Sequence, residues 1–125
     1  MSVKVDLAAL RDTVGRYGLA YLLTVSEDER PHAVAVQPVM REQVLHVDGL
    51  GNRTRANLAA RPDVTLLFPP HDPDGYSLIV DGRAHGDGGG ASVVPARAVL
   101  HRPADHPTVP ADGSCGNDCV PLSET

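Results

Sequence analysis

The feature that most constrains the fold of this chain is a series of short, β-prone segments separated by turns. Each segment has five to ten residues, and charged, glycine or proline residues lie between the segments. The expected strands are 19–26, 31–40, 44–48, 64–68, 76–85 and 92–100. Short consecutive strands joined by tight turns favour an antiparallel barrel over a parallel α/β sheet.

Two short helices interrupt the expected strands. Asp6 has a side chain that can cap a helix, and apolar residues recur at helical spacing over 7–17. A second helix is expected over 52–61, where the next residue is a proline. Pro38 lies within the expected strand 31–40. Because proline has no backbone N–H, we expect that end of the strand to be an edge or a bulge.

Length and charge restrict the classes of function. The chain has 125 residues, enough for one domain, which we expect to span 1–102 before an extended Pro- and Cys-containing tail over 103–125. A net charge of −5 argues against general binding to nucleic acid. No apolar run reaches the length of a membrane span, and the first residues lack a signal-peptide pattern. We therefore expect a cytoplasmic protein without nucleic-acid or membrane partners.

The strongest candidate for a binding site is the sequence DGLGNRTRAN at 48–57, where an expected strand meets an expected helix. A helix N-terminus presents free backbone N–H groups and the positive end of the helix dipole. Arg53 and Arg55 add guanidinium donors, and Thr54 adds a hydroxyl group. This combination suits a phosphate group. The spacing matches no Walker or dinucleotide motif, so an Asn-capped helix with two solvated arginines stays the alternative.

The tail offers a weaker site. Two histidines and two cysteines there have side chains of the kind that bind zinc, but their spacing matches no common zinc motif, so we expect no metal site. These residues are His101, His106, Cys115 and Cys119. Free thiols are the simpler interpretation, although the cysteines could close a small disulfide in an oxidising environment. A hydrolase is not favoured, since neither a nucleophile elbow nor an HExxH motif is present.

Residues 19–84 resemble the split-barrel flavoproteins of the pyridoxamine 5'-phosphate oxidase-like superfamily, which includes FMN enzymes and deazaflavin-dependent reductases. Three stretches carry the resemblance: LLTVSEDERPHAVAV, VLHVDGLGNRTRANLAARPDVTLLFPP and YSLIVDGRA. The resemblance implies a mainly β fold, a six-stranded antiparallel split β-barrel with two short helices, that works as a homodimer. It also implies that FMN or a deazaflavin coenzyme lies in a groove between the two subunits.

The resemblance assigns roles to two groups of residues. The cofactor phosphate would contact the start of the second helix. The ring would lie against the second and third strands and would be lined by the backbone of the second. The phosphate group comprises Asn52, Arg53, Thr54 and Arg55, with Asn57 supporting the loop. The ring segment comprises Val34, Ala35, Val36, Gln37 and Pro38. His32, Gln37 and Tyr76 are further candidates for hydrogen bonds to the ring or substrate, and no general acid or base is evident.

The sequence also departs from the oxidase pattern. FMN oxidases of this type carry Arg and Lys on the second strand, where this chain has Val34, Val36 and Pro38, and Thr54 replaces a common Lys. Oxidation of pyridoxamine phosphate is therefore not expected, and the apolar strand is more similar to the deazaflavin branch. We expect an oxidoreductase that transfers hydride to or from a small organic substrate. The alternative is a non-catalytic split-barrel module that binds a cofactor or haem.

Overall fold

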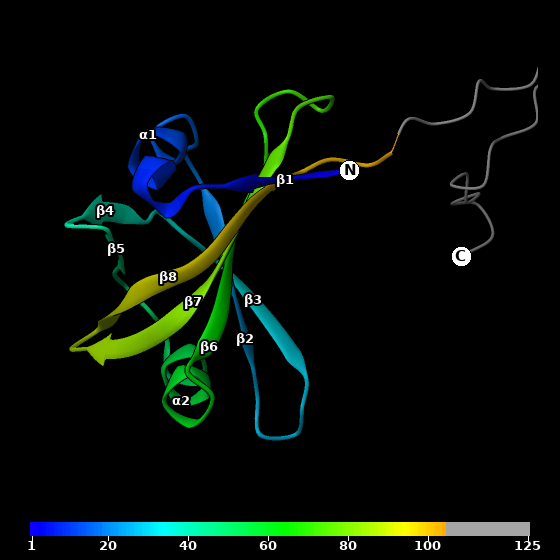
Figure 1. Cartoon of the computed structure of the whole chain (residues 1–125). Helices are drawn as coiled ribbons and strands as arrows, with labels where there is room; N and C mark the ends of the chain where they lie inside the picture. Colours follow the sequence, from blue (N-terminus) through cyan, green and yellow to red (C-terminus); the bar gives the residue numbers. More distant parts are fainter. Residues whose placement is uncertain (105–125) are drawn as a thin grey trace, which may run out of the picture.

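The computed structural model describes residues 1–104, which fold around one strongly curled antiparallel sheet (Figure 1). The strands are β1 (Ser2–Val5), β2 (Ala20–Val25), β3 (Pro31–Val36), β4 (Val39–Arg41), β5 (Val44–Val47), β6 (Asp63–Phe68), β7 (Ser77–Asp87) and β8 (Gly90–His101). The helices are the 3-10 turn η1 (Leu7–Ala9), α1 (Leu10–Val14) and α2 (Asn52–Ala60).

The strand order requires the sheet to curl. The order is β3-β2-β6-β7-β8-β5-β4, with β1 paired to the C-terminal part of β8. The two outermost strands, β3 and β4, are consecutive in the chain and are joined only by Gln37 and Pro38. An extended link from Val36 to Val39 spans at most about 11 Å. The two sheet edges must therefore approach each other at this point, as in a barrel that is split along one side.

The inner face of the sheet forms the core. Alternate side chains of β2 and β6 point inward and are buried, as expected for strands with one covered face. Leu22, Leu66 and Phe68 are almost fully buried there. The Phe68 ring packs against the Tyr17 ring in a tilted, T-shaped arrangement, with 6.0 Å between the ring centroids. These apolar side chains fill the barrel interior and leave no room there for a large ligand.

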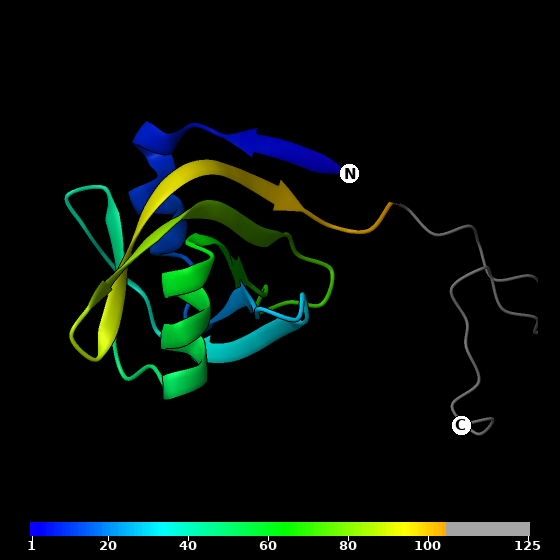
Figure 2. The same ribbon diagram turned by 90° about the horizontal axis from the view of Figure 1, so that it is seen from below.

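The helices lie at opposite ends of the curled sheet (Figures 1 and 2). Leu58 of α2 is buried in the core, and the Asn57 amide donates a hydrogen bond of 3.1 Å to the Thr24 hydroxyl of β2. This contact fixes α2 against the inner face of β2. Among residues 1–104, no helix is both long and apolar enough to cross a membrane.

The structure confirms the mainly β antiparallel barrel with short helices, and changes some boundaries. The expected strand 31–40 breaks into β3 and β4, because the backbone leaves the ladder at Gln37 and Pro38. The expected helix 7–17 is wrong in length, since only a 3-10 turn and the five residues of α1 are helical. β1 was not expected, and together with β4 it brings the strands among the described residues to eight.

Candidate functional site

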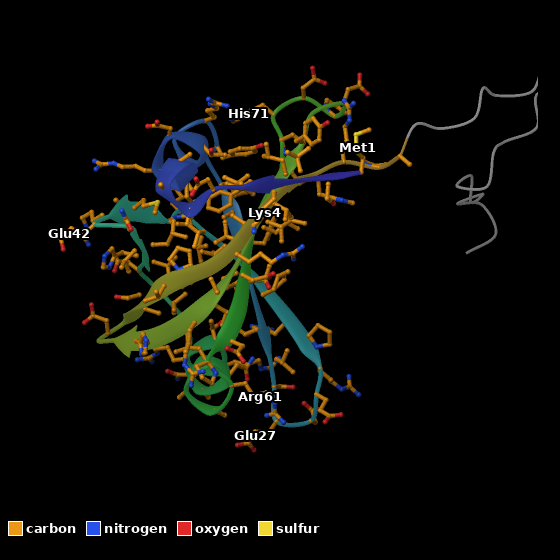
Figure 3. All side chains as sticks on the ribbon, in the orientation of Figure 1. Met1, Lys4, Glu27, Glu42, Arg61 and His71 are labelled. Atoms are coloured by element: carbon orange, nitrogen blue, oxygen red, sulfur yellow. The ribbon has the colours of Figure 1, made fainter. Side chains whose placement is uncertain are left out.

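A pocket lies between α2 and the turn that joins β2 to β3. Its volume is about 870 Å³. We call it the α2 pocket, and it is lined by Ser26, Glu27, Asp28, Arg30, Pro31, His32, Arg53, Ala56 and Asn57. The turn and the C-terminal end of α2 are held together by Arg61, whose guanidinium donates to the Glu27 carbonyl oxygen at 3.4 Å (Figure 3).

The first turn of α2 presents hydrogen-bond donors near this pocket. Gly51 precedes the helix in an extended conformation and provides no side-chain cap. The first-turn N–H groups therefore lack an internal side-chain acceptor from the N-cap position. A methyl group added to Gly49 or Gly51 would meet no atom within 4 Å, so a ligand can approach the backbone here. The helix dipole adds partial positive charge at the same end.

Arg53 is the pocket cation that is free to pair with a ligand. Arg30 forms an exposed ion pair with Asp28, with 3.3 Å between Nε and Oδ2. Arg53 has no ion-pair partner within residues 1–104, and its position in the first turn of α2 places it in the lining of the pocket. An anion in this pocket would meet one unpaired guanidinium beside the positive end of a helix.

The other predicted phosphate residues have different environments. The guanidinium of Arg55 donates to the side-chain oxygen of Asn52 on the surface of the helix, and neither residue lines the pocket. Thr54 is only 2 % exposed and faces the protein interior. Asn57 does line the pocket, and its amide nitrogen donates a hydrogen bond to the Thr24 hydroxyl. The structure therefore brings Arg53 and Asn57 together in the pocket and leaves Asn52, Thr54 and Arg55 outside its lining.

The predicted ring segment continues from the pocket along an edge strand. Pro31 and His32 line the α2 pocket, and Val34, Ala35 and Val36 follow them on β3. β3 pairs only with β2 among the described strands, so its other side is an open sheet edge. Gln37 and Pro38 form the link to β4, with Gln37 exposed. A ligand anchored in the pocket can extend along this edge, about 3.3 Å for each residue.

The sequence did not indicate the turn residues of the pocket. Ser26, Glu27, Asp28 and Arg30 belong to a charged turn that resembles any solvated hairpin loop. They join the site only because the antiparallel pairing of β2 and β6 places this turn beside α2. That pairing joins segments more than 40 residues apart, for example Tyr21 with Leu67, so no local pattern could have found them.

Two other predicted positions lie apart from the pocket. The hydroxyl of Tyr76 donates to the Met1 sulfur, and Arg102 lies over its ring at 4.6 Å, so Tyr76 belongs to the contact between the N-terminus and the end of β8. The ring of His101 contacts the Ser2 hydroxyl at 3.0 Å. His106, Cys115 and Cys119 lie outside the described residues. Within 1–104, no cluster of three metal-binding side chains is present.

Comparison with known families gives the class of this protein. A family model described as pyridoxamine 5'-phosphate oxidase matches residues 7–98. The match covers more than half of the chain, so the chain belongs to this family. The resemblance noted in the sequence is thereby confirmed. The matched range includes α2, the α2 pocket and the edge strand β3.

Particular relatives are mycobacterial. Two proteins described as uncharacterised, from Mycobacterium bovis and Mycobacterium tuberculosis, are each 47% identical to this chain over 136 aligned positions. The alignments cover 96% of this chain and 96% of each relative. The chain therefore corresponds to nearly the whole length of these relatives.

Solved structures share the fold at low identity. An F420 reductase matches with a TM-score of 0.59 and 17% identity, over 70% of this chain and 94% of its own. The FAD-binding protein of Mycobacterium smegmatis matches with a TM-score of 0.57 and 17% identity. The match covers 82% of this chain and 100% of that protein. HutZ, a haem storage protein of Vibrio cholerae, matches with a TM-score of 0.53 and 12% identity. The match covers 74% of this chain and 91% of that protein. At these identities the similarity shows the fold alone.

Proposed function

We propose that this protein is a split-barrel oxidoreductase that binds FMN or a deazaflavin coenzyme and transfers hydride to or from a small organic substrate. The observation that carries the proposal is the unpaired Arg53 at the start of α2, in the lining of a pocket of about 870 Å³. Membership of the oxidase family and structural neighbours that include an F420 reductase and an FAD-binding protein support it.

The residues present fit a phosphate-bearing cofactor. Arg53 would contact the phosphate through its guanidinium, and the first-turn N–H groups of α2 would add neutral donors. The bound ring supplies the hydride chemistry, while the protein binds it, orients it and limits its contact with water. Asn52, Thr54 and Arg55 would shape this helix start rather than contact the phosphate directly, given their positions.

The ring would lie along the open edge of β3. Val34 and Val36 turn their side chains inward, so the edge presents mainly backbone groups to a ligand. Ala35 is small and exposed, and it would let a flat ring approach closely. An apolar edge without Arg or Lys is similar to that of the deazaflavin branch, so we favour the deazaflavin coenzyme over FMN.

A second subunit would supply the other wall of the ring site. The outer face of β2 and β3 carries apolar side chains that are partly or fully exposed, with Tyr21 paired to Ala35 and Leu23 paired to Ala33. Tyr21 is 38% exposed despite its size. Burial of this face against a copy of the chain would remove apolar surface from water next to the proposed ring site.

The experiment that tests this proposal compares two arginine variants. The dissociation constants of the cofactor are measured by fluorescence for the wild type, Arg53→Ala and Arg11→Ala. Arg11 is an exposed residue of α1 outside the pocket. Loss of a hydrogen-bonded charge predicts at least about tenfold weaker binding for Arg53→Ala. Arg11→Ala is expected to bind like the wild type. Equal affinities of the two variants would refute the phosphate assignment.

A non-catalytic binding module is the second candidate. It is favoured by one observation: a haem storage protein shares the fold. Single-turnover mixing of the reduced, cofactor-loaded protein with a panel of organic acceptors separates the two candidates. Oxidation of the bound cofactor by at least one acceptor faster than free cofactor supports the enzyme. Rates equal to those of free cofactor favour the module.

A further inference from the structure

His32 is the imidazole of the α2 pocket. It is the second residue of β3, and it lies opposite Thr24 in the ladder with β2. Thr24 is buried on the inner face, so His32 faces the same side of the sheet as α2. The side chain is half-buried and lines the pocket together with Arg53 and Asn57.

The ring of His32 has no hydrogen-bond partner among the residues that the structure describes. His46 contacts the hydroxyl of Ser92 at 3.3 Å, and His101 contacts that of Ser2 at 3.0 Å. No hydrogen bond joins the His32 ring to another group of residues 1–104, and no side-chain nitrogen or oxygen in this range is both buried and unpaired, so the ring nitrogens are accessible to a partner that enters the pocket. A ligand in the pocket would provide such a partner.

Charged groups face the pocket from both sides of His32. The β2–β3 turn contributes Glu27 together with the mutually paired Asp28 and Arg30. α2 contributes Arg53. β2 contributes only the neutral Thr24 opposite His32. The turn pair cancels its own charge, so the balance near His32 is set mainly by Glu27 at the rim and Arg53 on the helix.

We propose that His32 donates a hydrogen bond to the cofactor phosphate beside Arg53 and thereby makes cofactor affinity depend on pH. This inference rests on the proposed function. A histidine side chain loses its positive charge between about pH 5 and 8, and a charged donor binds a phosphate more strongly than a neutral one. A contact between His32 and the phosphate therefore strengthens binding most when the donor carries a positive charge.

A phosphate monoester itself gains negative charge near about pH 6, so the affinity of every protein can change with pH for this reason alone. The test therefore compares variants at the same pH. Dissociation constants are measured for FMN and the deazaflavin coenzyme at about pH 5.5 and about pH 8. The proteins are the wild type, His32→Gln, His32→Lys and the control His85→Gln. His85 is an exposed residue of β7 outside the pocket.

The expected pattern is specific to a charged donor. At the lower pH, His32→Gln binds about tenfold more weakly than the wild type, and at the higher pH this difference shrinks severalfold. His32→Lys keeps tight binding at both pH values, and His85→Gln follows the wild type. The phosphate-free chromophore of the same cofactor binds the wild type and His32→Gln equally.

Two results would overturn the inference in distinguishable ways. If His32→Gln and the wild type bind with the same affinity at both pH values, while Arg53→Ala binds weakly, the role of His32 is refuted and the proposed function stands. If no protein in the series binds either cofactor, the proposed function and the inference both fail. Thermal unfolding of each variant establishes that the comparison is made on folded protein.

Discussion

At the scale of single residues, Tyr17 connects the segment after α1 to the end of β6 and the start of β7. Its hydroxyl donates a hydrogen bond of 2.7 Å to the carbonyl oxygen of Tyr76, and its ring meets the Phe68 ring at 61°. Burial raises the pKa of the Tyr17 hydroxyl above its ordinary value, and the nearby positive charge of Arg16 opposes this in part. The folded protein therefore favours the neutral form of this side chain.

This environment predicts how Tyr17→Phe changes stability. Near neutral pH the loss of one hydrogen bond is expected to lower the free energy of unfolding by about 1 kcal/mol. Because the pKa is higher in the folded state, the unfolded chain loses its proton first as the pH rises past about 10. The Tyr17 hydroxyl therefore adds to the free energy of unfolding below that pH, and this contribution is lost above it. Urea unfolding at several pH values should show the two proteins converging at alkaline pH, and a constant difference would contradict this account.

At the scale of secondary-structure elements, the β7–β8 hairpin depends on a glycine at its turn. A methyl group on Gly90 would overlap the backbone carbonyl oxygen of Val47, because β5 pairs with β8 beside this position. The neighbouring Gly89 has open space around it. The two glycines therefore provide a matched pair, one in a tight backbone contact and one at a free surface.

The pair predicts different effects of the same substitution. Gly90→Ala forces backbone apart and is expected to lower the free energy of unfolding by about 2 kcal/mol or more. Gly89→Ala adds a methyl group at the open surface and is expected to change it by less than about 1 kcal/mol. Chemical denaturation measures both values. Equal effects would show that β5 and β8 do not approach each other as described.

The sequence was informative where an element is defined by its own residues. Helix α2 was predicted well, because a strand, glycines and a following proline bound it locally. β1 could not be found, since Ser2–Val5 is short and partly polar, and its partner on β8 lies 95 residues or so further along the chain. The split of 31–40 was indicated only by Pro38, which marks an interruption without locating the next strand.

At the scale of the whole molecule, the outer face of β2 and β3 is an exposed apolar surface beside the candidate site. Ala33 is exposed at its centre, paired with the half-buried Leu23. If a second copy packs there, a charged side chain at 33 should prevent it, because its burial without a partner is costly. In the isolated chain the same side chain would reach water without strain.

This reasoning predicts the oligomeric state of two alanine variants. Sedimentation velocity of Ala33→Arg should give a monomer, whereas the wild type and the control Ala59→Arg should give dimers. Ala59 is exposed on α2 outside the pocket lining. A monomeric wild type, or a dimeric Ala33→Arg, would contradict the placement of the second subunit.

In the candidate site, too, the sequence indicates the residues that belong to one local segment, but not those that only the tertiary structure brings together. Arg53 could be selected from the sequence because it belongs to one strand–glycine–helix segment. The roles of Thr54 and Arg55 could not, since burial of the first and the contact of the second with Asn52 depend on how α2 rotates against β2. The turn residues entered the site only through the sheet order.

The measurement that tests the central claim most directly is a titration of the purified wild-type chain with FMN and with the deazaflavin coenzyme, followed by absorbance and fluorescence. We predict saturable binding of one cofactor per chain, with a lower dissociation constant for the deazaflavin coenzyme than for FMN. The Arg53→Ala variant should bind either cofactor more weakly than the wild type. Binding of neither cofactor at any accessible concentration would contradict the claim that the α2 pocket and the β3 edge form a flavin-type site.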